Sequence, residues 1–400
     1  MQQPFSSLLS WPAMAAALIL ASVVADAQLA PEITLQGQSR RAPQTAPKPG
    51  SYKIALENFG GKNGKEATRI LGDDLRTSGY FRFVRNPIKN FYTRGEATGS
   101  RLVGTLVDPK GNIIFERTYQ SNALRKSVHA FADDIIFTIT RTRSLVGSQI
   151  AFVRKSGRTK EVYLCDYDGG NVRPLTASRS LAVSPSISND RSLLTYTGYQ
   201  SGYPDIYTLE LPGRNRRRIV SSPGTNGGAA ISPNGKQIAL TMSFSGNSEL
   251  YVMSSRGGRA RALTKTRASE SSPSWSPDGR EIVFSSDQTG RPQLYRMSVS
   301  GGRPQLLRTG YAYCTEPSWS ADGRRIAFTG KRGGNLVIGV LDLASGKTKQ
   351  LRSGEDPSWG PDSRHLVCTS GGKLYRINAD SRETTRLTNF STISEPAWSR

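Results

Sequence analysis

The chain has 400 residues, of which 36% are hydrophobic and 21% are charged. This length and composition predict a soluble globular protein of about two domains, and they exclude collagen-like and wholly disordered classes. The 54 Lys and Arg residues outnumber the 31 Asp and Glu residues, so the formal net charge of +23 favours polyanionic neighbours such as nucleic acid, anionic lipid or acidic cell-wall polymer.

The first 27 residues have the features of a signal peptide. Residues 14–24 read MAAALILASVV, an apolar run too short to span a bilayer. The Ala-Asp-Ala at 25–27 fits a signal peptidase site, which makes Gln28 the expected mature N-terminus. The usual positive charge before the apolar run is missing, because the first Lys or Arg is Arg40. An atypical leader or a wrongly assigned start codon would explain this departure.

Residues 28–50 are rich in Pro, Gln and small residues and show no apolar periodicity. This pattern predicts an extended N-terminal arm. Two interpretations stay open, a linker without a partner and a tail that another protein captures by strand addition.

Residues 51–148 predict a small α/β domain with the order β-α-β-β-β-α. The expected strands are 52–56, 80–84, 101–107 and 112–119, and the expected helices have apolar faces at 67–78, ending at Gly79, and at 128–139. The Gly-rich turn at 60–64 lacks the spacing of a phosphate-binding loop. His129 and Asp133 are four residues apart on the second helix, and a packed residue is the expected role of this histidine.

The rest of the chain repeats one strand pattern six times. Its key position falls at 187, 231, 275, 319, 359 and 398, a spacing of 39 to 44 residues that is typical of four-stranded propeller blades. The first copy begins only at Ile150, with its second strand, so we expect its first strand to come from residues 395–399. Residues 149–400 therefore predict a six-bladed β-propeller closed by the C-terminal strand, and the whole chain an α+β two-domain fold.

Tryptophan occupies the key position in four copies, and we expect it to be inter-blade core rather than a ligand platform. The three cysteines, Cys165, Cys314 and Cys368, are far apart and lack CxxC spacing. They predict buried strand residues rather than a disulfide framework or a metal site, although an exported protein would permit one bridge.

The segment DLRTSGYF at 74–81 resembles the DLxxSGxF helix end of the TolB family, the periplasmic propeller proteins of the Tol-Pal system. IAFV at 150–153 and CDYDG at 165–169 are similar to the first blade of that family, and PAWS at 396–399 resembles its closing strand. The resemblance covers about residues 52–400. It implies a non-enzymatic, periplasmic, monomeric scaffold without a cofactor that supports outer-membrane integrity and cell division. The implied partners are the peptidoglycan-associated lipoprotein, on the propeller, and TolA, on the N-terminal arm.

Seven residues immediately before the key strands are expected at one mouth of the central channel: Asn226, Glu270, Thr315, Glu316, Glu355, Asp356 and Glu395. Five of them are carboxylates in an otherwise basic chain. We predict that this ring receives basic or amide groups of a partner. A weakly bound cation such as Ca²⁺ is a second hypothesis, with Glu316, Glu355, Asp356 and Glu395 as its ligands. The alternative is that these side chains only cap turns.

Other protein classes fit the chain less well. Arg214, Arg216, Arg217 and Arg218 form a basic cluster, either a solvated face or a contact for anionic cell-wall polymer. An exported propeller peptidase would need a GxSxG elbow, which is absent from the sequence, and a propeller lyase with a His-bound metal would have only His365 available. Nucleic-acid binding rests on charge alone, and the leader argues against it. The exported hydrolase or lyase and the wall-polyanion adaptor are kept as alternatives.

Overall fold

The protein is described by a computed structural model that covers residues 47–399. The predicted signal peptide and most of the predicted arm lie outside the described residues. Between residues 47 and 399, no helix is both long and apolar enough to cross a membrane.

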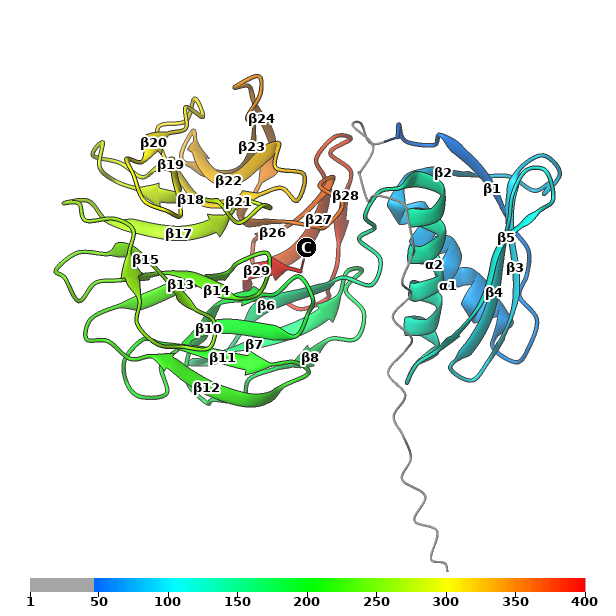
Figure 1. Cartoon of the computed structure of the whole chain (residues 1–400), viewed down its shortest axis with the longest axis horizontal. Coiled ribbons are helices and arrows are strands. Elements are labelled where there is room, and N and C mark those ends of the chain that lie inside the picture. Colours follow the sequence, from blue (N-terminus) through cyan, green and yellow to red (C-terminus); the bar gives the residue numbers. More distant parts are fainter. Residues whose placement is uncertain (1–46, 400) are drawn as a thin grey trace, which may run out of the picture. The chain divides into compact units, whose positions relative to one another are not determined.

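The N-terminal region is a five-stranded sheet with two helices (Figure 1, blue to cyan-green). Its elements are β1 (Tyr52–Leu56), α1 (Gly64–Ser78), β2 (Phe81–Phe83), β3 (Phe91–Thr98), β4 (Arg101–Val107), β5 (Ile113–Gln120) and α2 (Leu124–Thr140). The strand order is β2-β1-β3-β4-β5, with β1 parallel to both of its neighbours and the other pairs antiparallel. The sequence did not predict β3, because Gly95 and charged residues interrupt its apolar alternation, so the sheet has one strand more than expected.

Helix α1 forms where the sequence predicts an apolar face. Ala67, Leu71 and Leu75 are fully buried in the core that also contains Phe131 of α2. The helix ends at Gly79, whose φ of 72° is left-handed and whose amide donates to the Arg76 carbonyl. Glycine adopts this conformation without steric cost, which explains the sharp end of the helix.

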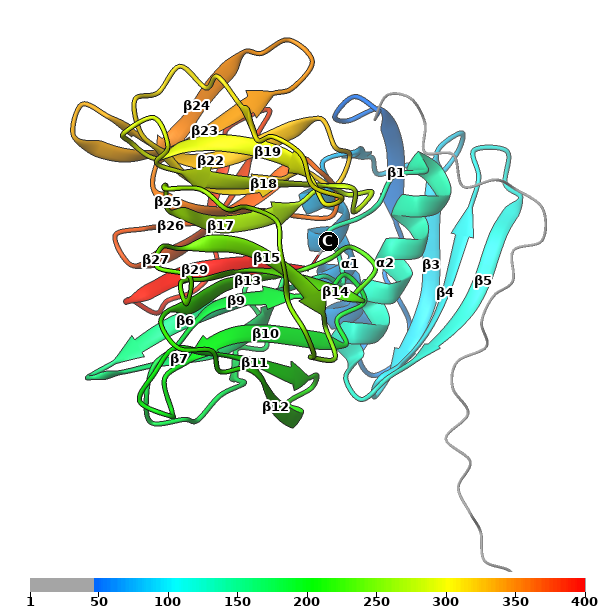
Figure 2. The ribbon, with the colours of Figure 1, turned by 60° about the vertical axis from the view of Figure 1, so that its left-hand side comes forward.

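Residues 149–399 form six four-stranded antiparallel sheets, which confirms the predicted propeller (Figure 1 and Figure 2, green to red). Each sheet is called a blade. Blade 1 contains β6 (Gln149–Ser156), β7 (Thr159–Asp166), β8 (Arg173–Pro174) and, as its innermost strand, β29 (Ile393–Trp398). Blade 2 contains β9 (Ala182–Ile187), β10 (Leu193–Gly198), β11 (Asp205–Glu210) and β12 (Arg214–Val220). Blade 3 contains β13 (Asn226–Ile231), β14 (Gln237–Met242), β15 (Glu249–Ser254) and β16 (Arg261–Ala262).

Blade 4 contains β17 (Glu270–Trp275), β18 (Glu281–Ser286), β19 (Gln293–Ser298) and β20 (Gln305–Leu306). Blade 5 contains β21 (Cys314–Trp319), β22 (Arg325–Arg332), β23 (Asn335–Asp342) and β24 (Thr348–Ser353). Blade 6 contains β25 (Glu355–Trp359), β26 (His365–Ser370), β27 (Lys373–Asn378) and β28 (Thr384–Arg386). The innermost strands are β9, β13, β17, β21, β25 and β29; each contacts the next, and β29 contacts β9. The ring is therefore closed, with β29 paired to β6.

Tryptophan side chains at the key position lie in the propeller core, as predicted. Trp275, Trp319, Trp359 and Trp398 are all buried. The Trp398 indole nitrogen donates to Ser148 Oγ at 2.8 Å, which ties the closing strand to the segment that enters blade 1. The three cysteines lie on β7, β21 and β26 as buried free thiols, and this also agrees with the sequence prediction.

Candidate functional site

Every innermost strand has a β-bulge at the same place, three residues before the key position. The pairing with the second strand of the blade shifts register there in all six blades. The bulge residues are Ser184, Gly228, Ser272, Glu316, Asp356 and Glu395, with φ between 51° and 60°. Residues other than glycine enter this left-handed region only at a cost, so the surrounding fold must hold the bulges in place.

Three bulge residues are carboxylates, and each of them joins its blade to the next. Glu316 Oε2 accepts a hydrogen bond from the Asp356 amide at 3.0 Å. Asp356 Oδ2 accepts from the Glu395 amide at 2.9 Å, and Glu395 Oε2 accepts from the Ser184 amide at 2.5 Å. We call Glu316, Asp356 and Glu395 the inner carboxylate chain. It connects the innermost strands of blades 5, 6, 1 and 2.

The inner carboxylate chain concentrates negative charge in a partly buried place. Burial and the nearby charges of Glu316 and Glu395 raise the pKa of Asp356 well above its usual value. Burial and the charge of Glu316 also raise the pKa of Glu355. The Lys160 ammonium lies 3.8 Å from Glu395 Oε1 and offsets part of this charge. Carboxylates held this way respond to a cationic or hydrogen-bonding group that approaches them.

The structure separates the seven predicted site residues into two groups. All seven lie within the innermost strands rather than immediately before them. Thr315 and Glu355 are half-buried and directly precede Glu316 and Asp356 of the inner carboxylate chain. Five of the seven predicted residues therefore lie in one region of the propeller. The predicted partner contact is wrong for Asn226 and Glu270, because both side chains are buried. The Asn226 amide group donates to the carbonyls of Pro204 and Ser222, so it fixes loops instead of facing a partner.

Glu270 belongs to a buried pair with Glu249 of blade 3. The Ser286 hydroxyl donates to Glu270 at 3.0 Å, and the Thr266 amide donates to Glu249 at 2.6 Å. Burial and the neighbouring Glu249 raise the pKa of Glu270 to about 7, so this pair retains a proton in mildly acidic solution. The pair anchors the segment between blades 3 and 4, and its role is structural.

The predicted cation ring is not formed. Between residues 47 and 399, no three side chains of His, Cys, Asp or Glu are grouped so that they could hold a metal ion. Glu316, Asp356 and Glu395 each direct one carboxylate oxygen to a backbone amide of the next blade, which holds the three side chains along the ring.

A second set of inter-blade contacts lies on the outer strands. Its members are cations at equivalent positions: Arg173, Arg217, Arg261 and Lys349. Each donates to a backbone carbonyl of the following blade, and the acceptors are Pro212 at 2.9 Å, Arg256 at 3.3 Å, Val299 at 2.7 Å and Ala379 at 2.9 Å. We call these the outer cation contacts. Part of the basic charge of the chain therefore holds the blades together.

The predicted basic cluster of blade 2 is partly used in this way. Arg217 makes an outer cation contact, Arg218 pairs with Asp205 at 3.2 Å, and Arg216 lies over the Tyr207 ring. These contacts lower the number of arginines in the cluster that are available to a polyanion.

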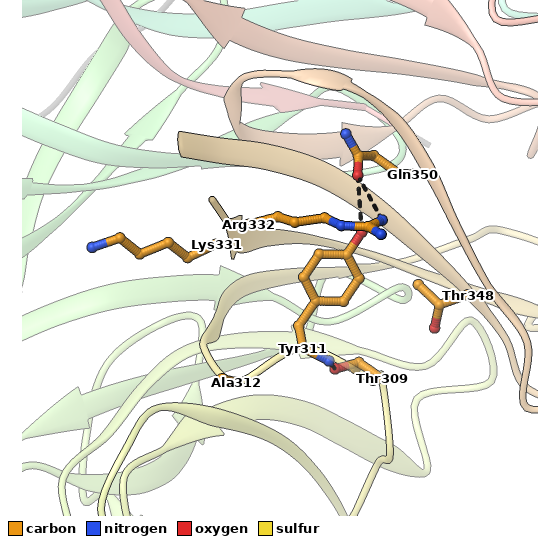
Figure 3. Close-up of a pocket in the computed structure, with 8 residues that line it drawn as sticks. Thr309, Tyr311, Ala312, Lys331, Arg332, Thr348 and Gln350 are labelled. Carbon is orange, nitrogen blue, oxygen red and sulfur yellow. Dashed lines mark hydrogen bonds between the residues drawn. The ribbon is translucent and has the colours of Figure 1, made fainter. Parts of the chain in front are cut away.

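A polar pocket of about 330 Å³ lies between the outer parts of blades 4 and 5 (Figure 3). Its lining includes Lys331, Arg332 and Thr348, with no carboxylate. Arg332 and the Tyr311 hydroxyl both donate to Gln350 Oε1, at 3.3 and 3.5 Å. Among the residues that the structure describes, the buried Thr348 hydroxyl has no hydrogen-bond partner. This composition suits a small anionic group.

The segment DLRTSGYF lies where α1 and α2 contact the propeller. Asp74 Oδ2 is 2.7 Å from His129 Nδ1, and Asp74 Oδ1 accepts a hydrogen bond from the Tyr167 hydroxyl. The Ser78 carbonyl accepts from Arg364 at 3.1 Å. The partner of His129 is therefore Asp74 of the other helix rather than Asp133, and the packed role predicted for this histidine agrees with its burial.

A family model described as the TolB beta propeller domain matches residues 137–400. The chain belongs to the TolB β-propeller family. The TolB homologue of Chlorobium chlorochromatii is 33% identical over 194 residues, which are 39% of this chain and 44% of that protein. The Tol-Pal system protein TolB of Bordetella pertussis is 31% identical over 157 residues, 38% of this chain and 34% of that protein. The aligned segments thus span less than half of these TolB relatives.

The fold of TolB is also found by comparison of structures. The crystal structure of TolB from Acinetobacter baumannii matches with a TM-score of 0.74 and 24% identity, over 89% of this chain and 98% of that one. Within this TolB propeller, the sequence pointed to the acidic residues but missed the bulge that orients them. The common offset of three residues before the key position is the signal that could have revealed it.

Proposed function

We propose that this chain is a non-enzymatic docking protein of a Tol-Pal system in the periplasm. Membership of the TolB family supports the proposal, as do relatives named as Tol-Pal system proteins. The observation that carries it is the half-buried acidic surface formed by Glu355, Thr315 and the inner carboxylate chain, in a protein of net charge +23. Such a local reversal of charge provides orientation for a partner with basic and amide groups.

The partner on this surface is the peptidoglycan-associated lipoprotein. The arm at residues 28–50 contacts a TolA-like inner-membrane protein, and the chain links the outer membrane to inner-membrane Tol components, which supports membrane integrity and cell division. The proposed domains are a signal peptide at 1–27, the arm, an α/β domain at 51–148 and the propeller at 149–400.

The environment of both histidines supports a function without catalysis. His129 lies against Asp74, and His365 Nδ1 is 2.6 Å from Asp362 Oδ2. All four side chains are buried. A general base must reach a substrate, and these two imidazoles are enclosed within the fold.

Calorimetry tests the proposal with residues 28–400 and the soluble domain of the peptidoglycan-associated lipoprotein from the same organism. We expect saturable one-to-one binding that Glu355→Gln weakens. Glu355 is suited to the test because its side chain makes no hydrogen bond within the described part of the chain. Glu383→Gln is the matched control, since Glu383 is exposed on an outer turn of the same blade. Absence of binding at low and high salt contradicts the proposal.

An adaptor for anionic wall polymer is the second candidate. The pocket lined by Lys331 and Arg332 favours it, because the pocket contains cations and no carboxylate. Retention on a dextran sulfate column, lost at high salt and reduced by Arg332→Gln, would support this function. Equal retention of the variant would contradict it.

A further inference from the structure

Strand β13 differs from the other innermost strands at its bulge, where it carries Gly228. A Cβ atom placed on Gly228 would lie 3.7 Å from the Ser272 amide nitrogen and 3.9 Å from Thr241 Oγ1, with Pro273 at 3.6 Å. These are ordinary contact distances. The gap over Gly228 therefore has room for a Cβ atom, and the Ser272 amide and the Thr241 hydroxyl border it. The Thr241 hydroxyl donates to the Gly227 carbonyl at 3.1 Å.

Blade 5 shows what occupies the equivalent gap. Glu316 Oε2 accepts from the Asp356 amide at 3.0 Å and from the Thr329 hydroxyl at 2.6 Å. Thr329 and Thr241 hold equivalent places, each on the second strand of its blade opposite the residue before the bulge. The gap over Gly228 thus has the same two kinds of donor beside it but no carboxylate, and the Thr241 hydroxyl donates to the Gly227 carbonyl instead.

A buried hydroxyl beside the gap gives an independent indication. Thr197 Oγ1 of blade 2 has no hydrogen-bond partner in the described structure, and Thr197 is 3% exposed. A Cβ on Gly227 would lie 3.8 Å from this oxygen. A buried hydroxyl without a partner is costly, so an acceptor that enters here gains a donor that is already in place.

We propose that the gap over Gly227 and Gly228 binds a carboxylate side chain, Asp or Glu, carried on a loop of the docked protein. The carboxylate accepts from the Ser272 amide and from the Thr241 hydroxyl, which turns to it from the neutral Gly227 carbonyl. Gly227 and Gly228 are half-buried, so the gap can be reached from outside. This inference rests on the proposed function only in taking the partner to be the protein that docks on the propeller.

The ring then has two arcs of different chemistry. The inner carboxylate chain provides acceptors on blades 5, 6 and 1, whereas Ser184, Gly228 and Ser272 leave blades 2, 3 and 4 without a carboxylate at the bulge. A partner loop that carries one acidic and one basic group would fit both arcs in a single orientation. The high positive charge of the whole chain attracts the acidic group.

Gly228→Glu tests the proposal, because it supplies the carboxylate from within the chain. Five of the six bulges already hold residues other than glycine at nearly the same φ, so the backbone accepts a side chain there. We expect the dissociation constant for the lipoprotein domain to rise about tenfold or more, since a charge-assisted hydrogen bond is lost. Gly228→Gln introduces a neutral side chain of the same size as glutamate and should raise the dissociation constant far less. Gly228→Ser should raise it still less. Equal losses for Glu and Gln would show steric filling alone and would overturn the proposal.

Amide spectra give a second test on the wild-type protein. The probe is the peptide acetyl-Gly-Gly-Asp-Gly-Gly-amide, with the Asn peptide as its neutral match. We expect the Asp peptide to move the Ser272 amide proton downfield, and Gly228→Glu to move it in the same direction without peptide. Identical responses to the two peptides would refute the carboxylate site. If the lipoprotein domain does not bind at all but the Asp peptide still shifts Ser272, the proposed function fails while the site stands.

Discussion

Carboxylates of the innermost strands join blades 5, 6, 1 and 2, whereas cations of the outer strands join four pairs of neighbouring blades. In the inner carboxylate chain a side-chain acceptor meets a backbone amide, and in the outer cation contacts a side-chain donor meets a backbone carbonyl. The inner groups are half-buried, whereas Arg261 of the outer contacts is exposed. Burial strengthens a charged hydrogen bond and makes its loss more costly, so the inner contacts should stabilise the ring more than the outer ones.

Removal of residues 393–400 should have the largest effect, because it deletes β29 and opens the ring. It removes two links of the inner carboxylate chain and exposes the edge of β6. We expect the unfolding midpoint to fall by about 10 °C or more, with loss of a single cooperative transition. Calorimetric melting measures this, and an unchanged melting profile would show that β29 is dispensable.

Loss of a single contact of the inner carboxylate chain should lower the stability of the protein less than loss of β29 does. Glu316→Ala removes the acceptor of the Thr329 hydroxyl and one of the two acceptors of the Asp356 amide, which also donates to Thr329 Oγ1 at 3.0 Å. The free energy of unfolding should fall by about 2 kcal/mol, and Glu316→Gln should restore part of it. Urea denaturation at neutral pH measures both variants. A loss for Glu316→Ala no larger than that for an outer contact would remove the proposed difference between the two sets.

The Glu249–Glu270 pair adds a pH-dependent contact between blades 3 and 4. The pKa of Glu270 rises from 4.5 to about 7 on folding, so the folded protein binds the proton more tightly than the unfolded chain. Stability should therefore fall as pH rises from about 4.5 to 7. Glu270→Gln, which keeps a neutral side chain, should flatten this part of the profile in urea titrations at several pH values. An unaltered slope would place its cause elsewhere.

Loss of one outer cation contact should lower the stability of the protein least. Arg261→Ala removes the hydrogen bond to Val299. The expected loss is about 0.5 kcal/mol, since exposed charged contacts contribute little. Arg259 is exposed on the turn that leads to the same strand, and its side chain makes no hydrogen bond or ion pair within the described part of the chain. Arg259→Ala is therefore the matched control, with no expected change. A loss for Arg261→Ala that exceeds that for Glu316→Ala would reverse the comparison.

The sequence predicts the blades well because the repeat keeps its turns and buried tryptophans at fixed offsets. The sequence does not predict β3, because Gly95 and charged residues interrupt the apolar alternation of this strand. Pairing with the neighbouring strands stabilises β3 instead. The candidate site was predicted in part. Repeat position alone shows that Asn226 and Glu270 occupy innermost strands, but their burial depends on loops that the repeat does not describe. The gap over Gly228 could not be predicted, because the donors around it come from two different blades.

Closure of the ring also constrains how the protein is made. Ser148 and Trp398 are hydrogen-bonded across 250 positions of sequence, and blade 1 needs β29 to be complete. During synthesis, one edge of β6 stays unpaired until the five other blades and β29 have emerged. Contacts this distant in sequence form slowly. A chain that ends before β29 therefore keeps one unpaired strand edge in blade 1, and an exposed edge of this kind favours aggregation.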